Sequence, residues 1–163
     1  MKKKLVVVVT ILMLVLLFSS IDAVSAQPKE SALIECVINI HTPIPGIPQE
    51  TDWFGEVEGC SLDGTISFNE QVYVDPIGKT LHFSEDFKIM PASGGEIIGY
   101  DLGVWNLTTG KFRSNGYVTS ASDEWADLVG YKFHEMGVTD STDLSDPTIT
   151  FHAPGTVMTL HAP

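Results

Sequence analysis

The chain has few cations and few cysteines. Its 163 residues include nine Lys or Arg against 21 Asp or Glu, which gives a formal charge of −12, and only two cysteines. Binding to phosphate backbones or anionic membrane surfaces needs clustered cations that release counterions, so neither nucleic acid nor an acidic lipid surface is an expected partner. Neither cysteine belongs to a CxxC motif, which argues against thiol redox catalysis.

Only one long apolar run occurs, Leu5–Phe18, and it directly follows Lys2–Lys4. Small residues follow at Val24–Ala26, so residues 1–26 are predicted to be a cleaved signal peptide of a secreted or extracytoplasmic protein. An uncleaved anchor is the alternative, because the run extended to Ile21 approaches the roughly 18–20 residues that span a bilayer. After cleavage we expect no stable membrane insertion, and the formal charge becomes −14 because three lysines and one aspartate are lost.

Export affects the interpretation of Cys36 and Cys60. In an oxidising compartment they can pair, and closing this loop would stabilise the fold by about 3–4 kcal/mol in the chain-entropy model. The alternative is two buried free thiols whose Cα atoms are more than about 7 Å apart. The sequence leaves both open.

Alternation with a period of two recurs after residue 27, whereas helical periodicity is nearly absent. Residues 27–52 are interpreted as an N-terminal strand and a Pro-rich linker, and residues 53–163 as the barrel domain. One short helix is predicted after Ser122. Beyond the first strand at Ile34–Ile40, strands are expected near 53–62, 64–74, 79–90, 96–105, 111–120, 129–138, 148–153 and 156–161, with turn residues between them.

Short hairpins in a domain of this size favour an all-β fold, a single antiparallel up-and-down β-barrel of about eight strands with at most one short helix. Two-residue turns at Pro76-Ile77 and Ser93-Gly94 would place Phe68 opposite Glu85 and Phe83 opposite Val104. With a three-residue turn at Thr108–Gly110, four strands would share one inward apolar surface: Ile66, Phe68, Val72, Leu81, Phe83, Phe87, Ile98, Tyr100, Leu102, Val104, Phe112 and Val118.

Two acids, Glu70 and Glu85, interrupt this inward surface. They are expected on neighbouring strands in diagonal positions, where burial and mutual repulsion should raise the pKa of at least one. They are weak candidates for general acid and base, or they orient a polar group of a ligand, or they lie at the barrel mouth in water; no residue is assigned as catalytic. The predicted ligand-binding residues are Phe68, Phe83, Glu85, Tyr100, Leu102 and Gly116.

No metal site or cofactor is expected. The five histidines are scattered, and His134-Glu135 lacks the second histidine of a helical zinc motif. Asp140, Asp143 and Asp146 lie in one loop without the close spacing and turn glycine of a calcium loop. The three tryptophans are interpreted as core or rim residues.

The segments Gly99–Val104, Gly116–Thr119, Trp125–Gly130 and Gly137-Val138 resemble the allene oxide cyclase barrel-like and dirigent-like proteins, over roughly residues 53–163. The resemblance implies an eight-stranded antiparallel barrel with an apolar cavity, assembled as a trimer in many plant members. It also implies that a reactive small molecule is steered through cyclisation or coupling by its bound conformation. No pocket residue is transferred from the family.

Three functions follow as hypotheses. The first is binding of a hydrophobic small molecule in the lumen. The second is a cyclase or isomerase in which Glu70 and Glu85 assist proton movement. The third is a non-catalytic surface interaction module with a filled barrel and outward-facing Tyr117 and Trp105. Assembly into a homo-oligomer is left open.

Overall fold

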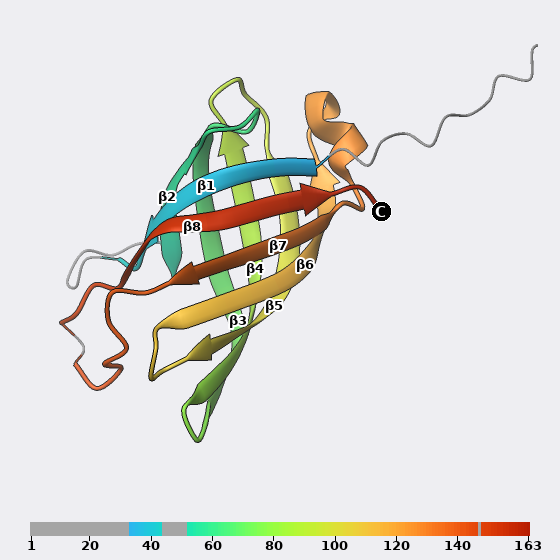
Figure 1. Cartoon of the computed structure of the whole chain (residues 1–163). Coiled ribbons are helices and arrows are strands. Elements are labelled where there is room, and N and C mark those ends of the chain that lie inside the picture. Colours follow the sequence, from blue (N-terminus) through green and yellow to red (C-terminus); the bar gives the residue numbers. More distant parts are fainter. Residues whose placement is uncertain (1–32, 44–51, 147) are drawn as a thin grey trace, which may run out of the picture. The chain divides into compact units, whose positions relative to one another are not determined.

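The protein folds into one closed barrel of eight antiparallel strands, seen in a computed structural model that describes residues 33–43, 52–146 and 148–163 (Figure 1). Each strand pairs with the next, and the last pairs with the first. The side chains of residues 71–77 are outside the description. The strands are β1 (Leu33–His41), β2 (Trp53–Glu58), β3 (Gly64–Ile77), β4 (Thr80–Pro91), β5 (Ile97–Asn106), β6 (Lys111–Ala121), β7 (Lys132–Val138) and β8 (His152–His161).

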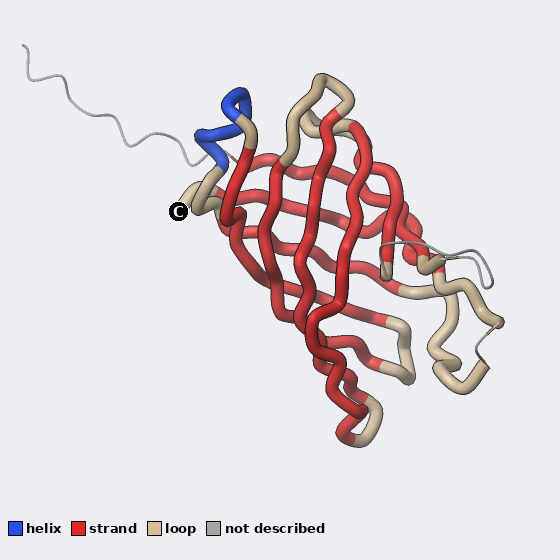
Figure 2. Tube along the Cα trace, turned by 180° about the vertical axis from the view of Figure 1, so that it is seen from behind, coloured by secondary structure: helices blue, strands red, loops and turns tan. Residues whose placement is uncertain are grey.

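The up-and-down barrel predicted from the hairpin spacing is therefore confirmed. The barrel begins at Leu33, since β1 pairs with both β2 and β8, and not at residue 53 as expected. Instead of two strands near 148–153 and 156–161, the structure has one continuous β8 from His152, with residues 148–151 in the preceding loop and a register shift opposite β1 between Ile38 and Ile40. Figure 2 shows the strands tilted around the barrel and joined by mostly short loops.

The predicted short helix is present as η1, a 3₁₀-helix at Asp123–Leu128 that buries Leu128. Ser122 precedes it as expected, but its hydroxyl oxygen accepts a hydrogen bond from Glu96 N (2.7 Å) and does not cap the helix. No helix among the described residues has the length and apolar character needed to cross a membrane.

From Gly64 to Glu70 the β3–β4 pairing keeps the predicted faces but is displaced along the strand, and beyond Glu70 a register shift displaces it by one residue more. Phe68 is opposite Phe87, and Glu70 is directly opposite Glu85, whereas a diagonal arrangement was expected. The turn lies at Gly78-Lys79, beyond the Pro76-Ile77 turn that was predicted. Because the displacement is an even number of residues, both phenylalanines still point inward. Val72, also predicted inward, has its side chain outside the described residues.

The predicted orientation of β5 is wrong. Phe83 pairs with Gly103 and not with Val104. A slip of one residue turns every side chain of a strand to the other face. Tyr100 and Leu102, predicted to bind a ligand in the lumen, are therefore on the outside with 42% and 59% of their surface exposed. The connection between β4 and β5 contains Gly94 and Gly95, both with positive φ, in place of the two-residue turn expected.

After Ile97, the inward residues of β5 are small, acidic or aromatic. A Cβ at Gly103 would overlap the Phe83 ring, and one at Gly99 would overlap the Phe87 ring. The two glycines thus allow these rings to lie across β5, and they leave Asp101 and Trp105 as the larger inward side chains at this end of the strand. Ile98 and Val104, also predicted inward, take the alternate, half-buried positions on the outer face.

The β6 strand has the predicted orientation, because its pairing with β5 is also displaced by one residue. Gly116 pairs with Asp101, where Leu102 was expected. Gly116 and Val118 are consequently buried and face inward, as predicted, and Phe112 is half-buried on the same face.

Apolar side chains fill one end of the barrel. The buried cluster includes Ile38, Ile66, Phe68, Phe87, Ile89, Ile97, Phe133, Met158 and Leu160. Phe87 and Phe133 stack there with ring centroids 4.2 Å apart. Cys36 and Cys60 form a disulfide with a Cα–Cα distance of 5.2 Å, so the pairing alternative is confirmed. This filled end leaves the other end of the barrel for a site.

Candidate functional site

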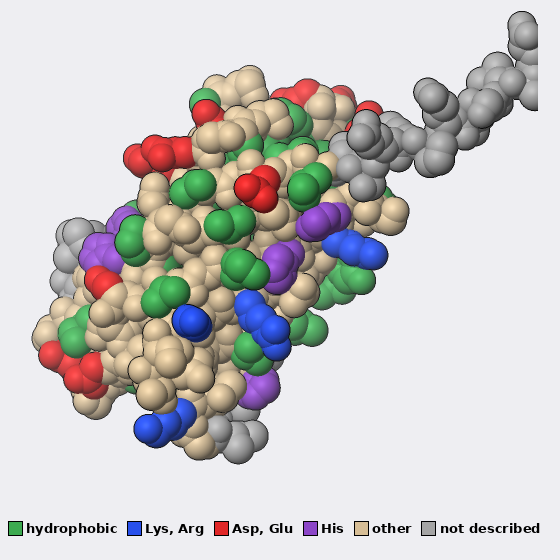
Figure 3. All heavy atoms as spheres, viewed as in Figure 1, with side chains coloured by type: hydrophobic (Ala, Val, Ile, Leu, Met, Phe, Trp, Pro, Cys, Tyr) green, Lys and Arg blue, Asp and Glu red, His purple; other side chains and the backbone are tan. Residues whose placement is uncertain are grey.

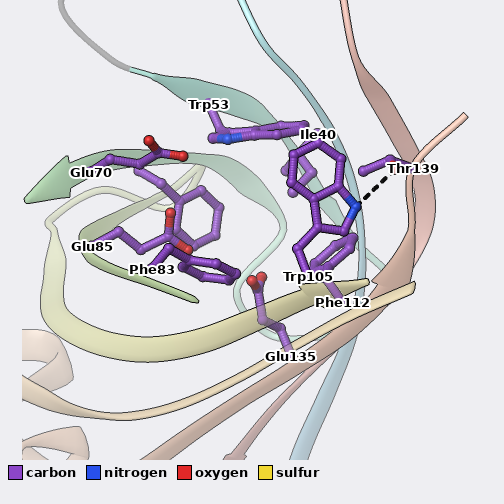
Figure 4. A pocket seen from close by; sticks show the side chains of 10 residues that line it. Ile40, Trp53, Glu70, Phe83, Glu85, Trp105, Phe112, Glu135 and Thr139 are labelled. Carbon is purple, nitrogen blue, oxygen red and sulfur yellow. Dashed lines mark hydrogen bonds between the residues drawn. The ribbon is translucent and has the colours of Figure 1, made fainter. Parts of the chain in front are cut away.

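A small cavity lies at the other end of the barrel, where β1 and β5 end and β2 and β6 begin. Its lining combines aromatic rings with carboxyl groups, and Figure 4 shows the carboxyls of Glu70, Glu85 and Glu135 pointing into the space between the rings. The lining residues are Ile40, Trp53, Phe68, Glu70, Phe83, Glu85, Trp105, Phe112, Glu135 and Thr139.

Two indoles form one wall of the cavity. The Trp53 and Trp105 rings meet edge to face, with centroids 6.4 Å apart. Trp105 Nε1 donates a hydrogen bond to Thr139 Oγ1 (3.1 Å), drawn in Figure 4, and the hydroxyl in turn donates to the carbonyl of Ser141 (2.7 Å). This chain of bonds fixes the Trp105 ring, so the wall is preformed. Trp105 is only 5% exposed, and the hypothesis that it faces outward is wrong.

An outer cleft continues from the cavity. It shares Trp53, Glu70 and Trp105 with the cavity and adds Phe151 and Leu144 on its outer side. Phe151 contacts both indoles, with ring centroids 6.4 Å from Trp53 and 5.6 Å from Trp105. The three shared side chains therefore lie at the passage between the cleft and the lumen.

The inner space is small. The inner cavity measures about 30 Å³ and the outer cleft about 260 Å³. Since one water needs about 10–15 Å³ by this measure, the inner cavity has room for a few waters at most. Side chains thus fill most of the lumen in this conformation, and a larger molecule reaches the inner carboxyls only if rings such as Phe83 move.

Three acids from three strands meet at this cavity, and two of them, Glu85 and Glu135, line it. Glu85 on β4, Asp101 on β5 and Glu135 on β7 each offer a carboxylate oxygen, and these oxygens all lie within 4.8 Å of one another. The three residues are 5%, 0% and 2% exposed, respectively. Glu85 and Asp101 are paired across β4 and β5, and Glu135 is paired with Ser114 on β6. We call Glu85, Asp101 and Glu135 the acid triad.

Burial raises the pKa of every triad member. Loss of water is the main cause for Glu85, and the neighbouring Asp101 and Glu135 charges add to it. Burial raises the pKa of Asp101 to about 7, partly offset by hydrogen bonding from Ser114. Burial and the Asp101 charge also raise the pKa of Glu135. Removing a carboxylate from water penalises its charged form, so the triad holds protons that exposed acids would release.

Glu70 lies nearer the outside. Burial and the Asp52 charge raise its pKa to about 7, against a hydrogen bond from the Trp53 side chain that lowers it. The backbone N–H of Glu70 donates to Asp52 Oδ2 (2.7 Å). The prediction that the pKa of at least one of Glu70 and Glu85 is raised is confirmed, since burial raises both.

Among the described residues, several buried polar atoms at the triad have no hydrogen-bond partner of good geometry, although Ser114 lies close enough to Asp101 and Glu135 to lower the pKa of both by hydrogen bonding. These atoms are both carboxylate oxygens of Asp101, Glu135 Oε2 and Ser114 Oγ. Ser114 is 0% exposed, and its hydroxyl acts on the pKa of both Asp101 and Glu135. Buried polar groups are normally paired, so this concentration in one place requires an explanation.

The cavity is lined by some, but not all, of the site residues that were predicted from the sequence. Phe68, Phe83, Glu70 and Glu85 line the cavity. Gly116 faces inward but is not among the lining residues, and Tyr100 and Leu102 lie outside.

Asp101, Glu135, Trp53 and Trp105 were missed as site residues. Asp101 was missed because the neighbouring residues Tyr100 and Leu102 are more apolar, and they were therefore predicted to be the inward residues of β5. Glu135 was considered only as a neighbour of His134 in a zinc motif. The pattern that could have found Asp101 is Gly99-x-Asp101-x-Gly103, an acid between two glycines on one face of a strand that lies opposite Phe83 and Phe87.

The acidic loop after β7 uses its carboxylates locally. Asp143 Oδ1 accepts from Ser145, and Asp146 Oδ1 accepts from Thr148, whose two hydrogen bonds lower the Asp146 pKa. Asp140 Oδ1 accepts from His152 N (2.9 Å). These acids stabilise turns of their own loop.

Comparison with known proteins finds no matching family model, no similar curated protein and no similar solved structure. The resemblance to the allene oxide cyclase barrel-like and dirigent-like proteins therefore stays a hypothesis, and the function has to be argued from the site.

Proposed function

We propose that this protein is an exported binding protein that takes a small, largely apolar molecule into the cavity end of its barrel. The ligand's body lies between Trp53, Trp105 and Phe151, and a hydroxyl or amine group meets the Glu70 carboxyl. The observation that carries this proposal is the continuous aromatic surface from the outer cleft to the cavity, with Glu70 at the passage.

The chemistry of the passage supports a ligand with one polar end. Apolar walls with a few convergent polar groups are typical of small-molecule sites. A carboxyl with a pKa of about 7 is present in both protonation states near neutrality, so Glu70 can accept or donate a hydrogen bond. An amine would also be attracted to the faces of the two indoles.

The available space sets the ligand's size. The outer cleft of about 260 Å³ is below the roughly 300–1,000 Å³ of sites for drug-sized ligands. We therefore expect ligands with a single ring or a short chain.

The disulfide supports the proposal that this protein acts outside the cytoplasm. The disulfide is of the kind that persists in oxidising compartments. The predicted signal peptide itself lies outside the described residues.

Indole fluorescence tests the proposal, since two tryptophans line the site. Benzyl alcohol and toluene share an aromatic ring and differ in the hydroxyl. We expect saturable quenching by both, with benzyl alcohol binding about tenfold more tightly, and this preference should disappear in Glu70→Gln and persist in Glu58→Gln, an exposed acid on β2. If neither benzyl alcohol nor toluene binds saturably, the proposal is overturned.

A cyclase or isomerase is a second candidate, favoured by the Glu70–Glu85 pair. The two acids face each other across β3 and β4, and both pKa values are raised towards the range suited to proton transfer. If the protein turns over a bound ligand, Glu85→Gln should abolish turnover while binding persists. Unchanged turnover in this variant would eliminate the mechanism.

A surface interaction module is favoured by the outer face. Tyr100, Leu102, Tyr117, Met136 and Val138 are all more than 40% exposed on β5, β6 and β7. Tyr100 and Tyr117 lie with ring centroids 6.2 Å apart. Figure 3, in the view of Figure 1, shows hydrophobic side chains scattered among polar and charged ones over the barrel wall. Light scattering of the wild type and Leu102→Lys would reveal an oligomer that uses this face.

A further inference from the structure

We propose that Glu85, Asp101, Glu135 and Ser114 form a calcium site inside the barrel. Glu85 and Glu135 also line the cavity, but this inference does not depend on small-molecule binding, because its test uses the metal alone. It departs from the sequence-based expectation, which named no metal site.

The spacing of the acid triad fits the radius of this ion. Oxygens on opposite sides of Ca²⁺ are about 4.6–5.2 Å apart, twice the usual Ca–O distance of about 2.3–2.6 Å. The triad's nearest oxygens all lie within 4.8 Å of one another. One ion among them would therefore contact all three carboxylates without a change of strand register.

Ser114 provides an independent observation. It is not an acid, it is completely buried, and its Oγ has no hydrogen-bond partner of normal geometry in the described part of the chain. Its position opposite Glu135, and its influence on both Asp101 and Glu135, place the hydroxyl between these two carboxyls. A buried hydroxyl oxygen beside these carboxylates can coordinate the same cation as they do.

The donor set selects a hard cation. All four residues offer oxygen, and no thiol or imidazole belongs to the cluster. Three carboxylates and one hydroxyl carry up to seven oxygens, within the six to eight that Ca²⁺ takes. Mg²⁺ keeps several of its waters and is disfavoured here, because the cavity above has room for a few waters at most.

The competing explanation is that the triad is neutralised by protons alone. Carboxyl-to-carboxylate hydrogen bonds would then satisfy some of its oxygens. In that arrangement the Ser114 hydroxyl donates to a carboxyl of Asp101 or Glu135, and calcium causes no response, so the two explanations differ in measurement.

The experiment uses the full chain stripped of metal with a chelator and dialysed into buffer at about pH 8. Ca²⁺ is titrated to about 10 mM, well above the 10⁻⁴–10⁻³ M dissociation constants of extracellular calcium modules. Thermal unfolding and calorimetry report binding. Tb³⁺, a calcium analogue, reports location, since its luminescence is excited by indoles nearby and Trp105 lines the same cavity as Glu85 and Glu135.

We expect one Ca²⁺ per chain, an increase in the midpoint of thermal unfolding, and Tb³⁺ luminescence that Ca²⁺ displaces. Asp101→Asn and Glu135→Gln should each weaken binding at least tenfold, and Ser114→Ala should weaken it less. The matched control is Asp143→Asn, an exposed acid of the loop after β7, which should bind as the wild type does.

Absence of a calcium response in the wild type at about 10 mM would overturn the proposal whatever the variants do. So would wild-type affinity in both Asp101→Asn and Glu135→Gln, or loss of binding in Asp143→Asn alone, which would assign the ion to the acidic loop. Tighter binding of Mg²⁺ than of Ca²⁺ would overturn the assignment of the metal. If one triad variant fails to fold, the other decides.

Discussion

Glu85 and Asp101 face each other across β4 and β5, and both carboxyls are enclosed by the barrel wall. Two acids in direct cross-strand positions normally destabilise a sheet. Here each also loses its water, and neither oxygen of Asp101 has a hydrogen bond of good geometry within the described part of the chain. A pair of this kind costs stability in the absence of a ligand, so its effects are measurable even before any ligand is identified.

Asp101→Asn should stabilise the metal-free protein at about pH 8. The amide removes a buried charge and supplies two N–H donors to the acceptors around it. We expect a gain of about 1–3 kcal/mol, because buried ion clusters are often improved by neutral replacements. Denaturant unfolding in a chelator measures it. Glu58→Gln on the barrel surface should change stability by no more than about 0.5 kcal/mol; a loss in Asp101→Asn larger than this would contradict the prediction.

Stability of the metal-free protein should fall as pH rises. Burial raises the pKa of both Glu70 and Asp101 to about 7, so the folded state binds their protons more tightly than the unfolded chain does. Stability is therefore highest below the ordinary carboxyl pKa of about 4 and decreases as pH rises through about 7, above which these two groups contribute no further loss. Thermal midpoints in a chelator at pH 5 and pH 8 should differ by at least about 4 °C. Equal midpoints would show that these acids are not effectively buried.

Loss of the disulfide should destabilise the barrel. Cys36 on β1 and Cys60 after β2 are 24 residues apart in sequence, and constraining a loop of this length is worth about 3 kcal/mol in the chain-entropy model. The double variant Cys36→Ala/Cys60→Ala should unfold at correspondingly lower denaturant. Mass spectrometry of peptides under non-reducing conditions checks the pairing first. Recovery of two free thiols from the native protein would remove the basis of this prediction.

Substitutions at two neighbouring residues of β5 should destabilise the fold by very different amounts. Leu102 is 59% exposed, so Leu102→Lys should change stability by less than about 0.5 kcal/mol. Gly103→Ala would push the Phe83 ring into the cavity and should cost about 1–3 kcal/mol. Chemical denaturation of the two variants compares them directly. If Leu102→Lys were the more damaging change, the observed orientation of β5 would be wrong.

The local sequence determined the architecture of this protein. Repeated two-residue alternation, and turn residues at hairpin spacing, were enough to predict a single up-and-down barrel with one short helix, and the face of β3, β4 and β6 that points inward. The inward positions of Phe68, Phe83 and Glu85 followed from alternation alone, since neighbouring side chains of a strand must point to opposite faces.

The tertiary structure decided the register, and with it the site. On β5 the apolar set Tyr100, Leu102 and Val104 competes with Gly99, Asp101 and Gly103, and burial of apolar surface favours the first. The observed strand takes the second, because the Phe83 and Phe87 rings lie across the glycines and occupy the space that larger side chains would need. No local pattern contains that constraint, and none places Glu135 of β7 beside Asp101, since only closure of the sheet brings these strands around one lumen.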